Sequence, residues 1–89
     1  MTDAFRDNTT EARFELVTNG LLSFADYRRE PGRLVIPHVE SDPALRGQGA
    51  AGRLMAQVAE VARAEDRRIV PTCSYAAAWL KRNDPGLVA

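Results

Sequence analysis

The stretch LRGQGAAG, residues 45–52, lies where the chain changes from a strand pattern to a helix pattern. Residues 34–39 before it are mostly apolar and predict a strand. After it, the apolar residues of 49–67 recur every three or four positions, which predicts an amphipathic helix. The apolar stripe of this helix consists of Ala51, Leu54, Met55, Val58, Val61 and Ala62. The quoted stretch is therefore a glycine-containing loop between a strand and a helix.

Such a loop is suited to bind phosphate. Its glycines let backbone N–H groups turn toward one point, and the helix adds four unpaired N–H groups and the positive end of its dipole. A diphosphate is the natural ligand of that arrangement. The same glycines also serve ordinary turns, so the loop alone leaves both interpretations open. A Rossmann site would need an early first strand and an acidic residue about 20 positions on, after a second strand. A Walker loop would need a Lys-Ser/Thr pair, and the sequence shows neither pattern.

The segment before this strand predicts two more strands in an antiparallel meander. Residues 13–18 alternate between apolar and polar, as in a half-buried strand. Asn19-Gly20 favours a type I′ hairpin turn, so a strand over 21–28 is expected to pair back on the first. Residues 1–12 are polar and without periodicity, and they predict a flexible tail with Phe5 as its anchor.

A proline-glycine turn at residues 31–32 leads into the strand over 34–39. Pro37 lies inside that strand and cannot donate to a ladder, which predicts a bulge or an unpaired edge there. The short strand over 68–72 follows a helix, so it is expected to lie parallel to the strand over 34–39.

Residues 74–82 predict a second helix, with Ser74 as N-cap and Trp79 and Leu80 packing inward. The predicted order is βββαβα, an α+β fold with a mixed four-stranded sheet formed by residues 13–89. The aromatic residues expected in its core are Phe5, Phe14, Phe24, Tyr27, Tyr75 and Trp79.

The composition limits the class of protein. A chain of 89 residues with 45% hydrophobic residues has room for one small domain. Twelve basic residues balance twelve acidic ones, which disfavours nucleic acid and anionic membranes as partners. Cys73 is the only cysteine and cannot form an intramolecular disulfide, and the N-terminus lacks the apolar run of a signal peptide. These features predict a cytoplasmic protein.

The run HVESDPALRGQG, residues 38–49, resembles the acyl-CoA loop of the GNAT N-acetyltransferases, whose pattern is Arg/Gln-x-x-Gly-x-Gly/Ala. Residues 46–51 match this pattern as RGQGAA. His38 and Glu40 before the loop, and VPTCSY at residues 70–75 after the helix, are similar to the small stand-alone members of that family. The resemblance covers roughly residues 13–82.

The resemblance implies a minimal GNAT-like fold that binds acetyl-CoA or coenzyme A. The pantetheine would run along the strand over 34–39, in the gap between it and the next strand, and the pyrophosphate would lie on the loop. Arg46 either contacts phosphate through its side chain or points outward while the backbone binds. No metal is expected. The implied cofactor-binding residues are Val39, Glu40, Ser41, Arg46, Gly47, Gln48, Gly49, Ala50, Ala51 and Cys73.

Three residues are candidates for catalysis. Cys73 lies between a strand end and a helix N-terminus, where the helix dipole would favour its thiolate. It either forms a covalent acyl intermediate, protonates the departing CoA thiolate or only lines the slot. His38 is the sole histidine and is of a type suited to a general base, and Glu40 is the alternative, acting through a water molecule.

The function that the resemblance implies is acetyl transfer from acetyl-CoA to an unidentified amine acceptor. The alternative is a non-catalytic acyl-CoA-binding or protein-interaction module, because the chain has no room for the N-terminal helices that shape the acceptor site in larger GNAT enzymes. A monomer or a weak homodimer is expected.

Overall fold

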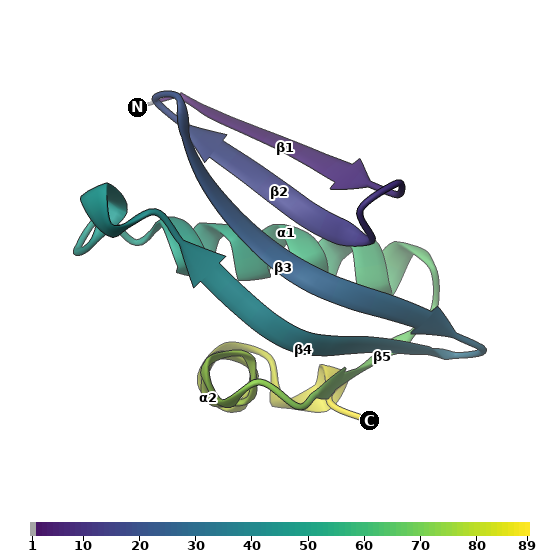
Figure 1. Cartoon of the computed structure of the whole chain (residues 1–89). Helices are drawn as coiled ribbons and strands as arrows, with labels where there is room; N and C mark the ends of the chain where they lie inside the picture. Colours follow the sequence, from purple (N-terminus) through teal and green to yellow (C-terminus); the bar gives the residue numbers. More distant parts are fainter. Residues whose placement is uncertain (1) are drawn as a thin grey trace.

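The computed structural model describes residues 2–89, which form a five-stranded sheet with one long helix across one face (Figure 1). The strands are β1 (Asp3–Asn8), β2 (Arg13–Thr18), β3 (Leu21–Glu30), β4 (Arg33–Ser41) and β5 (Arg68–Pro71). The helices are α1 (Ala50–Ala64) and α2 (Ser74–Asn83), with short 3-10 turns η1 (Pro43–Leu45) and η2 (Pro85–Leu87).

The strands lie in the order in which they occur along the chain. β1 to β4 are antiparallel neighbours, and β5 pairs parallel to β4. The turn between β2 and β3 has Asn19 at φ 51° and Gly20 at φ 82°, the positive values that a type I′ turn requires. The α+β class, the meander and the parallel last strand are therefore confirmed, whereas the predicted number of four strands is wrong.

The additional strand is β1, in the segment for which the sequence suggested a flexible tail. It pairs with β2 over its whole length, with Phe5 opposite Leu16 and Asp7 opposite Phe14. Two adjacent apolar residues, Ala4 and Phe5, in an otherwise polar hexamer do not alternate and are too weak a pattern to identify a strand. As an edge strand, β1 has one polar, exposed side, and this explains its composition.

Glu15 of β2 holds β1 in place on the face of the sheet opposite α1. Its carboxylate accepts hydrogen bonds from Arg6 Nε at 2.6 Å, Arg13 Nε at 2.6 Å and Asn8 Nδ2 at 3.0 Å, and two of these donors belong to β1. The Glu15 side chain is only 5% exposed. The hydrogen bond from Asn8, followed by those from the two arginines, lowers the pKa of Glu15 from 4.5 to about 2 in spite of its burial.

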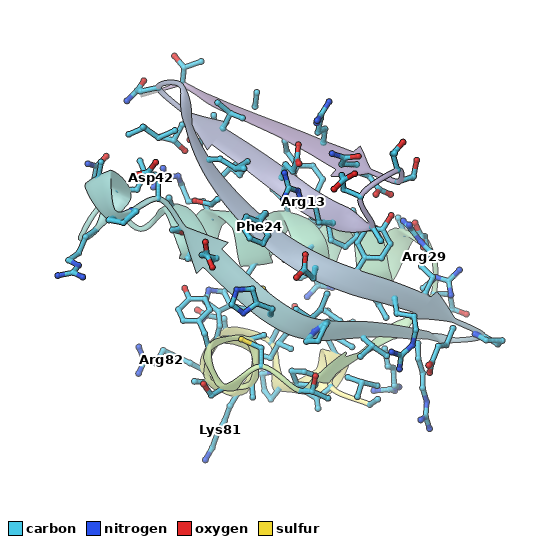
Figure 2. All side chains as sticks on the ribbon, viewed as in Figure 1. Arg13, Phe24, Arg29, Asp42, Lys81 and Arg82 are labelled. Carbon is cyan, nitrogen blue, oxygen red and sulfur yellow. The ribbon has the colours of Figure 1, made fainter. Side chains whose placement is uncertain are left out.

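The hydrophobic core lies between the sheet and α1. Phe14 and Leu16 of β2 meet Leu54 and Met55 of α1 there, and all four are fully buried or nearly so. Phe24 lies instead on the opposite face of the sheet, where the Arg13 guanidinium covers its ring at 4.8 Å (Figure 2).

Two details of the C-terminal half differ from the predictions. Tyr75, expected in the core, is 40% exposed. Cys73, rather than Ser74, occupies the N-cap position of α2 and makes no side-chain capping bond. α2 lies beside β5 at the edge of the sheet and contacts both α1 and β4 (Figure 1). Within residues 2–89, no helix is long and apolar enough to cross a membrane.

Replacing Glu15 by Gln is expected to lower the free energy of unfolding at neutral pH by about 2 kcal/mol, because both ion pairs are lost. The folded-state pKa lies below the ordinary value of 4.5, so the carboxylate stabilises the fold above that pH and the stabilisation is lost as the pH falls toward about 2. Urea denaturation at a series of pH values measures the free energy of unfolding of both proteins. The difference between Glu15→Gln and wild type is expected to decrease as the pH falls from 4.5 toward about 2.

The exposed carboxylate of Glu60, which pairs with Arg63 on the same helix, provides the control. Glu60→Gln is expected to change stability little at any pH. If the free energies of unfolding of Glu15→Gln and wild type differ by the same amount at neutral and at acid pH, the proposed role of Glu15 is contradicted.

Candidate functional site

β4 and β5 separate partway along β4. Their pairing ends at Ile36 and Pro71, although β4 continues to Ser41. One further hydrogen bond, from the Cys73 N–H to the Ile36 carbonyl at 3.2 Å, is the last between the two segments before they separate. The register between β3 and β4 shifts between Asp26 and Arg28, and β4 contains the extra residue there. Pro37 lies within this bulge, so the predicted interruption of the sheet is confirmed.

The bulge determines which main-chain groups of β4 face away from β3 beyond the point where the pairing with β5 ends. Asp42 N–H donates to the Leu22 carbonyl at 2.9 Å, so these two residues form a hydrogen-bonded pair. Because hydrogen-bonded and non-hydrogen-bonded pairs alternate in an antiparallel ladder, the main-chain groups of Glu40 face β3. Those of Val39 and Ser41 face the other way, toward the side that β5 has left.

The loop after β4 connects this unpaired end of the strand to the start of α1. Asp42 caps η1 by accepting the Ala44 N–H at 2.9 Å. Gly47 at φ 78° and Gly49 at φ 72° adopt the left-handed conformation that side chains disfavour. Gly49 is the N-cap of α1, and no side chain caps the helix. The glycines thus serve the turn and leave the helix N-terminus uncovered.

Several N–H groups of this loop are free to bind a ligand. Gln48 N–H donates to the Leu45 carbonyl at 3.0 Å, and Arg46 N–H donates to the Pro43 carbonyl at 3.2 Å. The remaining N–H groups have no backbone acceptor within the described part of the chain. They belong to Gly47, Gly49, Ala50, Ala51 and Gly52. Unpaired N–H groups at the positive end of a helix, here one of 15 residues, are the kind of donor that anions bind in proteins.

The two long side chains of the loop, Gln48 and Arg46, do not bond to these free N–H groups. Gln48 is exposed and its side-chain amide donates to the Ala44 carbonyl at 3.2 Å. Arg46 is also exposed, and within residues 2–89 it forms no ion pair. These backbone N–H groups of the loop are therefore unpaired, as phosphate binding by the backbone would require. Contact of the Arg46 side chain with phosphate stays a prediction.

Arg53 is a loop-positioning residue that the sequence did not reveal. From the first turns of α1 it donates to the Gln48 carbonyl and, through Nε, to Asp3 Oδ2 at 2.7 Å. Asp3 belongs to β1, and this contact with Arg53 is the main cause of the lowered pKa of Asp3. In a trans peptide the carbonyl and the next N–H point in opposite directions, so holding the Gln48 carbonyl turns the Gly49 N–H away from Arg53. Helical periodicity predicts only that Arg53 lies on the polar face, and no sequence signal links it to Asp3.

The three catalytic candidates lie around the separation of β4 and β5. Cys73 is half-buried and packs against the edge of the core, and its backbone is bonded to β4 at Ile36. His38 and Glu40 are exposed and adjacent on one face of β4, with Nε2 and Oε1 3.0 Å apart. The His38 ring also lies 6.0 Å from the ring of Phe24. A thiol and an imidazole–carboxylate pair thus lie at the same break in the sheet.

Replacing Arg53 by Ala is expected to increase the mobility of the loop, because the Gln48 carbonyl loses its donor. Nuclear magnetic resonance order parameters of the Gly47 and Gly49 amides are expected to fall. Arg63→Ala is the matched control, since Arg63 lies on the same helix and pairs with Glu60 and Asp84 instead. Unchanged order parameters in Arg53→Ala would show that the loop conformation is independent of β1.

A family model described as GCN5-related N-acetyl-transferase matches residues 13–86 of the 89-residue chain. No curated protein sequence matches the chain significantly. The matched range begins at β2 and contains the bulged strand, the loop with its free N–H groups, and α1, β5 and α2. The chain belongs to the GCN5-related N-acetyltransferase family.

Proposed function

We propose that this protein binds acetyl-CoA and transfers its acetyl group to an amine. One observation carries the proposal: beyond the point where β5 stops pairing with it, β4 continues into a loop with five N–H groups that have no backbone acceptor, at a helix N-terminus. A ligand with an extended amide-containing arm next to a diphosphate matches both parts of this site. Coenzyme A has that chemical form.

The residues present fit such a ligand. The free N–H groups between Gly47 and Gly52 would hold the diphosphate without any lysine. The main-chain groups of Val39 and Ser41 would pair with the amides of the pantetheine arm, as an added strand would pair with β4. Glu40 would contribute its side chain only, because its main chain pairs with Phe24.

The bound ligand supplies an activated thioester. The chain must then provide a base for the attacking amine and a proton for the departing thiolate. His38 and Glu40 are adjacent and exposed at the break in the sheet, where they would accept the proton of the amine. Cys73, next to the end of β5, would donate a proton to the thiolate or accept the acetyl group itself.

The acceptor is an amine that approaches from the face of the sheet not covered by α1, where Phe24 lies (Figure 2). His38 and Glu40 lie on the same face as Phe24. A net charge of zero gives no support for a nucleic-acid partner. The single cysteine fits a reducing compartment such as the cytoplasm.

Replacing Gly49 by Val is expected to weaken CoA binding at least tenfold. A β-branched residue is disfavoured at φ 72°, and each charge-assisted hydrogen bond lost costs about 1.5 to 3 kcal/mol. Gln48→Ala is the control, because the Gln48 N–H is already bonded within the loop and its side chain makes one exposed contact. Calorimetric titration of CoA into both variants measures the difference, with circular dichroism as a check on folding. Equal affinity in Gly49→Val and wild type would contradict the diphosphate site.

Replacing Cys73 by Ala is expected to preserve CoA affinity, because the backbone bond to Ile36 remains, and to reduce acetyl transfer. Proton transfer by a positioned group contributes about a hundredfold or more, so a loss of that order is expected in an assay with a panel of amines. Ser74→Ala, at the neighbouring exposed residue, serves as control. A wild-type rate in Cys73→Ala would limit Cys73 to lining the opening. CoA binding by the wild type without transfer to any amine would instead favour the non-catalytic module.

A further inference from the structure

A cavity of about 360 Å³ lies where the turn between β3 and β4 meets the C-terminal end of α1 and η2. This turn is at the opposite end of the domain from the glycine loop between β4 and α1 (Figure 1). α1 begins at that loop and has 15 residues, so about 20 Å separate the loop from the cavity. Pockets that enclose a small ligand have volumes of about 300 Å³ or more. The cavity is therefore a separate site from the one proposed for CoA.

Guanidinium groups dominate the lining of this cavity, and one carboxylate accompanies them. The charged lining residues are Arg63, Asp66, Arg67 and Arg68. Ion pairs within the chain compensate the charges of two of the arginines. Arg63 pairs with Asp84, and Arg67 pairs with Glu65 through Nε at 2.8 Å. The remaining arginine decides what the cavity can bind.

Arg68 is the arginine of the cavity whose charge has no partner. It is exposed, and within residues 2–89 no carboxylate forms an ion pair with it. Its Nη1 donates to the Gly86 carbonyl at 2.6 Å, and this bond holds the guanidinium beside η2. Nε and Nη2 have no acceptor in the described part of the chain. These two groups form a planar fork that matches two oxygens of one anion.

A second unpaired guanidinium belongs to the neighbouring strand. The parallel pairing of β4 and β5 places Arg33 directly opposite Arg68. Arg33 is also exposed, and its side chain forms no ion pair within residues 2–89. Like charges at opposite positions of neighbouring strands repel each other, and a bound anion would relieve that repulsion. The cavity thus lies beside two positive charges that the chain itself does not compensate.

Two features near the cavity work against an anion, and neither cancels these charges. Asp66 is exposed and contributes one negative charge against the two unpaired guanidiniums. The other feature is the negative end of the α1 dipole. Its carbonyls are already paired, since Ala62 accepts the Arg67 N–H at 2.8 Å and Arg63 accepts the Asp66 N–H at 3.1 Å. The balance at the cavity stays positive.

We infer that this cavity binds a small phosphate monoester, with Arg68 as the main contact and Arg33 as a neighbouring charge. A phosphate monoester carries about −1.5 to −2 charges at neutral pH, which matches two unpaired guanidiniums better than a single carboxylate does. A free phosphate ion would fill only part of the cavity, and Leu87 offers an apolar contact for the organic group of an ester. The inference is independent of the proposed function.

Amide nuclear magnetic resonance at constant ionic strength tests this site, with glycerol 3-phosphate as the probe at neutral pH. Saturable shifts are expected for the amides of Gly32, Arg68 and Gly86, which line or adjoin the cavity. Arg68→Ala is expected to weaken binding at least tenfold, because the charge-assisted hydrogen bonds of the fork are lost. Asp66→Asn is expected to strengthen binding about threefold, because a repelling charge is removed. Asn tolerates the φ of 55° at this position.

Two further variants separate the site from general charge effects. Lys81→Ala removes an exposed cation that projects from α2 outside the cavity, and it is expected to bind the probe as the wild type does (Figure 2). Arg33→Ala breaks no ion pair within residues 2–89 and is expected to weaken binding about threefold. Circular dichroism checks the fold of each variant. If Arg68→Ala does not fold, Arg33→Ala and Asp66→Asn decide the matter.

Three results would overturn the inference. The first is the absence of saturable shifts in the wild type, and the second is an affinity for glycerol 3-phosphate that is the same in folded Arg68→Ala, or in both Arg33→Ala and Asp66→Asn, as in the wild type. Either result removes the anion site. The third is that inorganic phosphate binds as tightly as glycerol 3-phosphate, which would show that the organic group makes no contact and that the ligand is not an ester.

Discussion

The interruption of the sheet at Pro37 is the constraint on which the functional geometry depends. Proline has no N–H to donate, and the extra residue of β4 at this position reverses the direction that the following main-chain groups face. The groups of Val39 and Ser41 consequently point away from β3 at the place where β5 no longer pairs with β4. A regular ladder would satisfy these groups internally and would leave no opening for an extended ligand.

The conformation of the glycine loop between β4 and α1 depends on a second constraint. Glycines at positive φ turn the loop, and Arg53 holds the Gln48 carbonyl so that the next N–H faces away from it. Arg53 is in turn held by Asp3, whose carboxylate also accepts a hydrogen bond from the buried Thr18 hydroxyl at 2.8 Å. The edge strand β1 is therefore linked through Arg53 to the glycine loop, although it lies at the far side of the sheet from β5.

This arrangement is suited to a very small domain. Most of the groups that would hold the ligand are main-chain groups, which need no dedicated side chains beyond the glycines that expose them. Charged side chains are largely used for holding elements together instead, as in the contacts of Glu15 with β1 and of Arg29 with Asp7 and Glu65. The uncovered face of the sheet then carries the exposed pair His38 and Glu40 beside Phe24.

The local signals in the sequence determined most of the fold and the position of the loop. The Asn19-Gly20 turn, the helical stripe of α1 and Pro37 each act over a few residues, and backbone sterics or periodicity make their meaning independent of distant contacts. Tertiary contacts decided the rest. β1 forms because Glu15 collects Arg6 and Asn8, the loop is oriented by a bond between residues fifty positions apart, and Tyr75 and Trp79 meet Gly52 only when α2 packs on α1. These pairings lie outside the regular spacing of apolar residues in strands and helices, so no periodicity encodes them.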